Sequence, residues 1–447
     1  MFIHPSLILM DRCKYIAAVL LTFIIASCES YKKPERPNII LIMVDDMGYE
    51  CLSCNGSTSY NTPVLDHLAS NGIRFSHCIS QPLCTPSRVK IMTGLYNYRN
   101  YDYFGHLENE AYTFGNLMKD AGYATCIAGK WQLNGLAYKN EIPYWEDQTR
   151  PIAFGFDEYC LWQLTKSRNE GERYARPLIE QNGEVLKTED NDYGPDIFTR
   201  YLLDFMTRKK DEPFFIYYPM VLVHEPFVPT PESPDWVYPS LRYKTDTSYF
   251  RDMVAYTDYI IGEIITELRR LDIEDKTIII FTGDNGTHPS IYSLTYKGLV
   301  QGGKGNTIDA GVHVPLIIYW PQIKNKGFVY DGLIEFSDFF PTLAEITGQK
   351  VETDGHSFYP LLAGKDLVPR ETVFVHYDPK WSQNVNQYRN QFVQTIEFKL
   401  YQDGWFFNLA NDILEKKPLI MDSLNDKELH YRSLLKKELD KHPAWKK

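Results

Sequence analysis

Two polar pairs in the sequence each follow a run of apolar residues. Asp45-Asp46 comes directly after NIILIMV, and Asp284-Asn285 follows TIIIF within FTGDNG. Apolar runs of this kind are typical of parallel strands that are buried on both faces of a sheet. Because ligands bind outside the carboxyl ends of such strands, both pairs are expected at one edge of the sheet. Three carboxylates and an amide oxygen suit Ca²⁺, with Mg²⁺ second, although either pair alone is most often a turn.

The segment CTPSR, from Cys84 to Arg88, is a second place where chemistry is expected, and Thr93-Gly94 follows it. A free cysteine is usually a small hydrophobe, so a buried cysteine in a turn beside proline is the alternative interpretation. The segment alone does not decide between the two. Residues elsewhere in the chain favour chemistry.

Two lysines and a histidine stand at positions suited to binding an anion. Lys130 lies in GKW, just past an expected strand that ends at Ala128, and Lys304 lies in the Gly-rich segment GGKGN. His224 lies in VHEPF, shortly after the apolar run FFIYY. A lone lysine is usually a solvated surface group, and an isolated histidine is more often structural. The near-neutral pKa of a histidine also suits proton transfer to a leaving group.

These segments together resemble a known family. The residues from Cys84 to Gly94 match C-x-P-S-R-x4-T-G, the signature of type I sulfatases in the alkaline phosphatase superfamily. GYATCIAGKW, AYTDYIIGEIITEL, GGKGNTIDAGVHVPLIIYWP, SDFFPTLAEITG and DGHSFYPLL are similar to sulfatase segments in the same order. In that family a maturation enzyme oxidises the cysteine to Cα-formylglycine. One hydroxyl of the hydrated aldehyde attacks sulfur and the second expels the bound sulfate.

The resemblance implies a role for each candidate residue. Cys84 becomes the formylglycine, and Arg88 holds it. Lys130 and Lys304 bind the sulfate oxygens, and His224 helps to protonate the leaving alcohol. The implied ligands of the single Ca²⁺ ion are Asp45, Asp46, the modified Cys84, Asp284 and Asn285.

One departure from the family pattern affects the chemistry. The family segment GKWHLG carries a histidine that is thought to act as a base when sulfate is expelled, and this chain has GKWQLNG with Gln132 in its place. An amide can hydrogen-bond the nucleophile but cannot accept a proton near neutral pH. Asp309 and His313, where Glu and Arg are usual, are expected to support the loop rather than to contact sulfate.

The elements that would position these residues alternate between apolar runs and helical stretches. Expected strands are 38–44, 123–128, 214–218, 277–281 and 314–319, and expected helices are 62–71, 114–121 and 249–271. This alternation predicts an α/β fold with a doubly wound, mainly parallel sheet, and the resemblance implies the alkaline phosphatase-like version of it. Later strand candidates at 372–377, 391–395, 399–402 and 405–409 predict a smaller C-terminal antiparallel sheet. We therefore expect a catalytic domain at 38–350 and a C-terminal subdomain at 351–447.

The N-terminus indicates export. The apolar run at 15–26 is too short to span a membrane as a helix and ends in IASC, which resembles a bacterial lipobox. We expect residues 1–27 to be a lipoprotein signal peptide, Cys28 to carry lipid, and 28–37 to form a tether. A signal for soluble secretion with an incidental cysteine is the alternative. The expected location is the periplasm or cell envelope, with membrane attachment through the lipid.

The composition of the chain argues against some other classes of protein. The chain has 447 residues and a formal net charge of −11, which argues against a nucleic-acid partner. Eight cysteines do not predict a disulfide framework, because Cys13 and Cys28 belong to the signal and Cys84 to the chemistry. The five that remain are Cys51, Cys54, Cys78, Cys126 and Cys160, an odd number. The C-x-x-C spacing in CLSC has no second pair at metal-binding distance along the chain.

The sequence thus predicts an enzyme that hydrolyses sulfate esters, with a sulfated small molecule or glycan as substrate. Carbohydrate is inferred from family habit and export alone. One alternative is a phosphomonoester or phosphonate hydrolase, although such relatives commonly attack with Ser or Thr or bind two zinc ions. Another is a catalytically silent glycan-binding lipoprotein, which only Gln132 supports.

Aromatic residues after Thr93-Gly94 are candidates for stacking on sugar rings, with core packing as the alternative. They are Tyr96, Tyr98, Tyr101, Tyr103 and Phe104. Trp381 and Arg389, in a polar stretch of the C-terminal part, are candidate specificity residues.

Overall fold

A ten-stranded sheet runs through the centre of the computed structural model, which describes residues 36–379 and 391–445. Its strands, in order across the sheet, are β12 (Phe328–Glu335), β2 (Ile73–Ile79), β11 (His313–Tyr319), β8 (Thr277–Gly283), β1 (Asn38–Val44), β7 (Phe214–Pro219), β3 (Ala124–Lys130), β4 (Glu158–Trp162), β5 (Glu180–Gln181) and β6 (Glu184–Val185). The five predicted strands are all present. Strands β2, β4, β5, β6 and β12 were not predicted.

Most neighbouring strands of the central part are parallel. β1 pairs in parallel with β7 and β8, and β3 with β7 and β4. β11 is antiparallel to both β8 and β2. The chain leaves β8 and enters β11 at the same edge of the sheet, so β11 must run in the opposite direction. The predicted α/β class with a mainly parallel sheet is confirmed.

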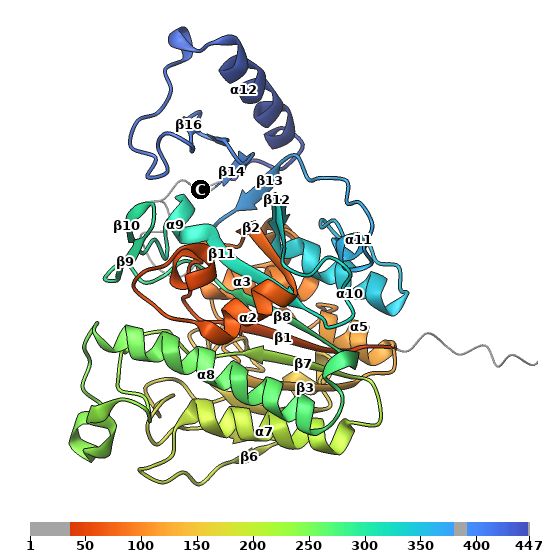
Figure 1. Ribbon diagram of the computed structural model, residues 1–447, viewed down its shortest axis with the longest axis vertical. Coiled ribbons are helices and arrows are strands. Elements are labelled where there is room, and N and C mark those ends of the chain that lie inside the picture. Colours follow the sequence, from red (N-terminus) through yellow and green to blue (C-terminus); the bar gives the residue numbers. More distant parts are fainter. Residues whose placement is uncertain (1–35, 380–390, 446–447) are drawn as a thin grey trace, which may run out of the picture. The chain divides into compact units, whose positions relative to one another are not determined.

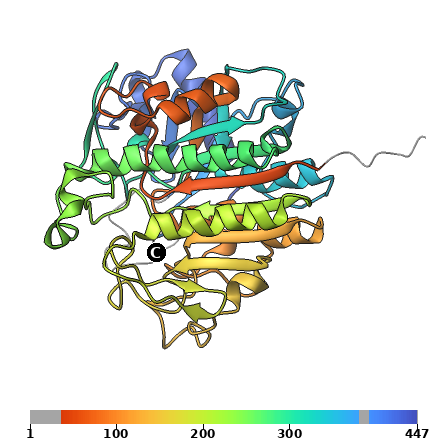
Figure 2. The same ribbon diagram turned by 60° about the horizontal axis from the view of Figure 1, so that its bottom comes forward.

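Helices cover both faces of the sheet, as in a doubly wound fold. Ile40 and Ile42 of β1 belong to a core with α2 (Pro63–Asn71), α7 (Gly194–Lys209) and α8 (Tyr249–Arg270). The alternate residues Ile39 and Leu41 belong to a second core with α3 (Cys84–Thr93), α5 (Phe114–Asp120) and α10 (Phe339–Thr347). Figures 1 and 2 both show α7 and α8 side by side on one face. The shorter helices are α4 (Asn97–Asn100), α6 (Arg150–Ala153), α9 (Asp309–Val312) and α11 (Tyr359–Leu362).

A separate four-stranded antiparallel sheet follows in the sequence, as predicted. Its order is β13 (Val373–His376), β14 (Gln391–Gln394), β15 (Phe398–Tyr401) and β16 (Phe406–Asn408). Helix α12 (Asp426–Leu439) packs Leu435 and Leu439 against it. A two-stranded hairpin, β9 (Tyr292–Thr295) and β10 (Gly298–Gln301), lies between β8 and β11 in the sequence. The domain boundary at residue 350 stays a prediction.

Some of the predicted features lie in segments that the structure does not describe. The signal peptide, Cys28, Trp381 and Arg389 lie outside residues 36–379 and 391–445. Within those ranges no helix is both long and apolar enough to cross a membrane. The six cysteines there are free, in agreement with the predicted lack of a disulfide framework.

Candidate active site

The predicted polar pairs meet at the carboxyl edge of the central sheet. Asp45 and Asp46 follow β1, and Asp284 follows β8, which is the parallel neighbour of β1. The backbone N–H of Asp46 donates to Asp284 Oδ1 at 3.0 Å, and the Asp284 N–H donates to the Val44 carbonyl at 2.9 Å. The expectation that both pairs share one edge is confirmed, since parallel neighbours end side by side.

Strand β2 and helix α3 bring Cys84 to the same edge. Cys84 is the first residue of α3, and the loop before it is fixed by Ser87. The Ser87 hydroxyl donates to the Leu83 carbonyl at 2.8 Å and accepts the Gln81 N–H at 3.1 Å. A serine three residues after Cys84 therefore ties the first helical turn to the incoming loop.

The threonine and glycine at the end of the signature close the same helix. Gly94 has φ +68° and donates its N–H to the Lys90 carbonyl. A Cβ at Gly94 would lie 2.7 Å from the Phe340 Cβ, so the position has no room for a side chain. The Thr93 hydroxyl donates to the Val89 carbonyl at 2.7 Å and accepts from Asn100 Nδ2 at 2.7 Å. The motif thus fixes both ends of the helix that presents Cys84.

The oxygen ligands predicted for a cation are buried together. Asp45, Asp46, Asp284 and Asn285 are all 0% exposed. Ligand atoms of Asp45, Cys84 and Asp284 lie within 4.8 Å of one another. Asn285 Nδ2 donates to Asp46 Oδ1 at 2.9 Å, whereas its Oδ1 is buried and accepts no hydrogen bond from the described residues. A buried amide oxygen without a donor is rare, and coordination to a hard cation would satisfy it. The residues present therefore fit calcium.

Each of these carboxylates also has a cationic partner. Lys130 Nζ donates to both oxygens of Asp45, at 3.0 and 2.8 Å. Arg88 Nη2 donates to Asp284 Oδ2 at 3.2 Å, and Arg88 Nη1 to the Lys130 carbonyl at 3.2 Å. Both of these predicted cations therefore reach the carboxylate cluster. Lys130 is the last residue of β3, so the expectation that it lies beyond the strand was wrong by two residues.

The third cationic partner, Lys304, joins the cluster to the predicted histidine. Lys304 Nζ lies 2.6 Å from Asp46 Oδ2 and 3.0 Å from His224 Nε2. His224 Nδ1 lies 2.7 Å from the Glu225 carbonyl, which only accepts, so Nδ1 carries the proton. His224 Nε2 is then the acceptor from Lys304. Burial lowers the pKa of His224 to about 3, although Asp46 acts in the opposite direction.

Two carboxyl groups of the cluster have opposite pKa shifts. Burial alone would raise the pKa of Asp45, but Lys130, His224 and Arg88 together hold it well below its usual range. Burial and the neighbouring Asp45 charge raise the pKa of Asp284 to about 7. Three carboxylates packed this closely repel one another, so a divalent cation would favour the ionised state of all three.

Gln132 stands beside Cys84, where the resemblance placed it. The Cys84 thiol donates to Gln132 Oε1, with an S–O distance of 3.7 Å. Gln132 has φ +52°, and its N–H donates to the Gln163 carbonyl at 3.1 Å. Burial raises the pKa of the Cys84 thiol. The amide oxygen thus accepts the hydrogen bond of the predicted nucleophile.

One residue near the cluster was missed by sequence reasoning. Arg173 is 5% exposed, and its Nη1 lies 3.8 Å from Asp45 Oδ2. Its guanidinium lies over the Trp162 ring, 4.0 Å from the centroid. In the sequence it stands in the polar stretch RNEGERYAR, where a lone arginine is typical of solvated surface. No periodicity or motif in that stretch distinguishes it.

The small C-terminal sheet supports the loop that carries Lys304. The Gly305 N–H donates to the Pro82 carbonyl at 2.8 Å, which joins this loop to the one that precedes Cys84. The Tyr377 hydroxyl donates to the Gly305 carbonyl at 3.3 Å. Tyr401 donates to Thr307 Oγ1 at 3.1 Å, and Lys399 donates to the Thr307 carbonyl.

Most aromatic side chains proposed for sugar stacking belong to the core. Tyr96, Tyr101 and Phe104 are buried, and Tyr96 packs edge-on against Phe374. The packing alternative is therefore correct for these three. Tyr98 and Tyr103 are partly exposed and remain available to a ligand.

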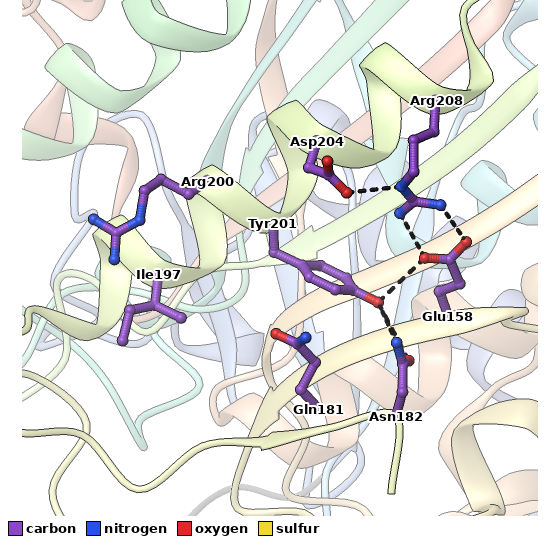
Figure 3. A pocket seen from close by; sticks show the side chains of 8 residues that line it. All are labelled: Glu158, Gln181, Asn182, Ile197, Arg200, Tyr201, Asp204 and Arg208. Atoms are coloured by element: carbon purple, nitrogen blue, oxygen red, sulfur yellow. Dashed lines mark hydrogen bonds and ion pairs between the residues drawn. The ribbon is translucent and has the colours of Figure 1, made fainter. Parts of the chain in front are cut away.

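A shallow hollow of about 520 Å³ lies between α7 and strands β4 and β5 (Figure 3). It contains none of the predicted site residues. Arg208 at this hollow donates to both oxygens of Glu158, at 2.8 and 2.7 Å, and to Asp204 at 2.7 Å. This arginine is held by two carboxylates, as is usual for a structural ion pair on a surface.

The chain is similar in sequence and structure to known proteins. The family model described as Sulfatase matches residues 37–349. N-acetylgalactosamine-6-O-sulfatase of Bacteroides thetaiotaomicron is 28% identical over 418 residues, which cover 76% of this chain and 79% of that protein. Arylsulfatase A of Homo sapiens is 31% identical over 378 residues, with 76% and 70% covered. The structure of Ps i-CgsB in complex with k-i-k-neocarrahexaose has a TM-score of 0.73 at 25% identity, and 91% of this chain and 92% of that chain are covered.

These similarities agree with the arrangement at the sheet edge. The matched region contains the cysteine signature, both polar pairs, both lysines and the histidine. The relatives match along most of the chain rather than along one segment. The chain therefore belongs to the sulfatase family, the sulfuric ester hydrolases of the alkaline phosphatase superfamily.

Proposed function

We propose that the protein hydrolyses a sulfate ester on a carbohydrate, with a formylglycine derived from Cys84 as nucleophile and Ca²⁺ as cofactor. The observation that carries this proposal is the buried cluster in which Cys84, Asp45 and Asp284 come within 4.8 Å of one another. Carbohydrate is supported by relatives named for N-acetylgalactosamine 6-sulfate esters and by the oligosaccharide bound to Ps i-CgsB.

The residues around Cys84 are suited to hold a charged nucleophile. The hydrated aldehyde would supply one hydroxyl for attack on sulfur and a second for release of sulfate. Arg88 is buried beside Cys84 on α3, and its side chain is fixed by Asp284 and by the Lys130 carbonyl. A guanidinium fixed in this way can stabilise negative charge on the nucleophile without further reorganisation. The bound calcium ion would supply Lewis-acid charge to the same place.

Lys304 and His224 are suited to act together on the leaving alcohol. Lys304 Nζ donates to His224 Nε2 at 3.0 Å, so the two side chains hold each other in place. Because His224 is neutral, Lys304 is the proton donor of this pair, and it can protonate the departing oxygen while His224 positions its ammonium. Lys130, which is paired with Asp45, would bind the sulfate oxygens from the other strand end.

We also propose that the protein is matured by a formylglycine-generating enzyme and is attached to a cell-envelope membrane through lipid on Cys28. Both proposals rest on the sequence: Pro86 and Arg88 are the residues that maturation reads, and IASC resembles a lipobox. A lipid-anchored enzyme facing the periplasm would meet exported or imported sulfated glycans.

Parallel assays on aryl sulfate and aryl phosphate test the proposed function, followed by a panel of defined sulfated mono- and disaccharides. We expect sulfate ester hydrolysis by wild type and none by Cys84→Ala with an unchanged circular dichroism spectrum. Peptide mass spectrometry of the active protein should show formylglycine at position 84. Preference for phosphate would favour the phosphohydrolase alternative. Sugar binding without any turnover would favour the silent glycan-binding alternative.

A further inference from the structure

We propose that Arg173 is a substrate-binding residue whose guanidinium donates hydrogen bonds to the oxygens of the sulfate group that is cleaved. This inference rests on the proposed sulfatase function. It adds a cation to the arginine and two lysines of the family pattern.

The first argument is the position of the guanidinium. Arg173 Nη1 lies 3.8 Å from Asp45 Oδ2, and Lys130 Nζ lies 2.8 Å from the same oxygen. Trp162, on which the guanidinium stacks, is the register partner of Lys130 in neighbouring parallel strands. Arg173 therefore lies beside the sulfate-binding lysine at the strand ends rather than at the rim of the site.

The second argument is that the guanidinium has an unused donor. Arg173 Nη1 is buried and makes no hydrogen bond to any residue of 36–379 or 391–445. At 3.8 Å from Asp45 it is too far for a hydrogen bond. A buried donor without an acceptor is costly, so a ligand that accepts from Nη1 would explain why this arginine is kept. Asp45 does not need it, because Lys130 already contacts both oxygens of that carboxylate.

The third argument is that the side chain is held in place. Stacking on Trp162 fixes the plane of the guanidinium, as cation–π contacts do. The next residue, Tyr174, donates to the carbonyls of Val221 and His224, which ties this loop to the catalytic histidine. A planar guanidinium held beside a lysine can donate hydrogen bonds to two oxygens of a tetrahedral anion. The hollow in Figure 3 offers a contrast, because Arg208 there is occupied by Glu158 and Asp204.

Binding of inorganic sulfate at saturating Ca²⁺, measured by calorimetry, tests the assignment directly. We expect Arg173→Gln to weaken sulfate binding by about ten- to a hundred-fold, the loss typical of a hydrogen bond between charged groups. Arg173→Lys should recover part of the sulfate affinity. The control variant Arg208→Gln should bind sulfate like wild type. The kcat/KM for aryl sulfate should fall by a similar factor in Arg173→Gln, with unchanged calcium content and melting temperature.

Three results would overturn the inference. Unchanged sulfate binding in Arg173→Gln would show that the guanidinium does not contact the sulfate group. Loss of calcium affinity with sulfate binding intact at saturating Ca²⁺ would give Arg173 a supporting role toward Asp45. A loss of kcat/KM confined to substrates with a second anionic group would place its contact elsewhere on the sugar. Absence of turnover in wild type, by contrast, would contradict the proposed function. The sulfate-binding measurement would still test the role of Arg173, because it does not depend on turnover.

Discussion

Gln132 and Cys84 face each other in the active site, with 3.7 Å between the amide Oε1 and the thiol Sγ. The side chain that accepts the Cys84 hydrogen bond can therefore orient a hydroxyl but cannot remove its proton near neutral pH. The carboxylates close to Cys84 are already paired: Asp45 with Lys130, and Asp284 with Arg88. Among the residues that the structure describes, the imidazole base of the family pattern is therefore missing beside Cys84.

Replacement of Gln132 by histidine should accelerate sulfate release. General base catalysis contributes roughly a hundred- to ten-thousand-fold, so its absence can make release the slow step. Rapid-mixing assays of wild type should show a burst of alcohol followed by slower release of sulfate, and Gln132→His should shorten the slow phase. Equal rates of both products without a burst, together with a slower Gln132→His enzyme, would instead indicate that Gln132 contacts the substrate.

Removal of calcium should lower both activity and stability. A ligand bound only by the folded protein stabilises it, by about 2.7 kcal/mol when its concentration is a hundred times Kd. Thermal unfolding with chelator and with added Ca²⁺ should differ by several degrees. Asp284→Asn should reduce this difference, whereas Asp204→Asn at the surface should keep it. Full activity in protein shown by elemental analysis to lack metal would contradict the calcium proposal.

The depressed pKa of His224 should make the calcium-free protein lose stability in acid. In the folded protein this pKa is about 3, below the usual 6.5, so between these values the unfolded chain binds more protons. The stabilisation is complete above about pH 6.5 and is lost as pH falls toward 3. Melting temperatures measured across this range should fall less steeply in His224→Asn. An NMR titration of His224 with a midpoint near 6.5 would disprove this.

Lipid on Cys28 should place the protein with membranes after cell fractionation. Cys28→Ala removes the thiol that carries the lipid and should move the protein to the soluble fraction with unchanged kcat/KM on a soluble substrate. Labelling of wild type, but not of Cys28→Ala, by a fatty-acid probe would identify the modification. A wild-type protein already found in the soluble fraction would favour the alternative of a secretion signal.

Most of the site could be predicted because its residues are marked by local sequence. Asp45 and Asp284 directly follow apolar strands, and strand ends gather at one edge of a parallel sheet. Cys84 lies in a signature whose serine, threonine and glycine each have a local structural task. For these residues the local sequence is enough to predict where the side chain lies in the fold.

The remaining features depend on contacts between distant segments. Arg173 reaches the cluster through a loop whose sequence shows no period, and its contacts with Trp162 and those of Tyr174 help to fix its direction. Strand β2 was missed because Arg74, Ser76 and His77 interrupt its apolar pattern, although the strand lies between β12 and β11 in the sheet. The antiparallel direction of β11 depends on the edge of the sheet at which the chain re-enters after β8. The local sequence pattern does not predict that edge.

The support that Tyr377, Lys399 and Tyr401 give to the Lys304 loop has a consequence for the order of folding under the proposed export. A chain that crosses the membrane from its N-terminus delivers the carboxylate cluster and Cys84 first and the small sheet last. A partly exported chain that has folded only its large sheet would hold the calcium ligands in place while Lys304 still lacks its support. Hydrolytic competence would therefore arrive only when the final quarter of the polypeptide has crossed the membrane and paired its strands.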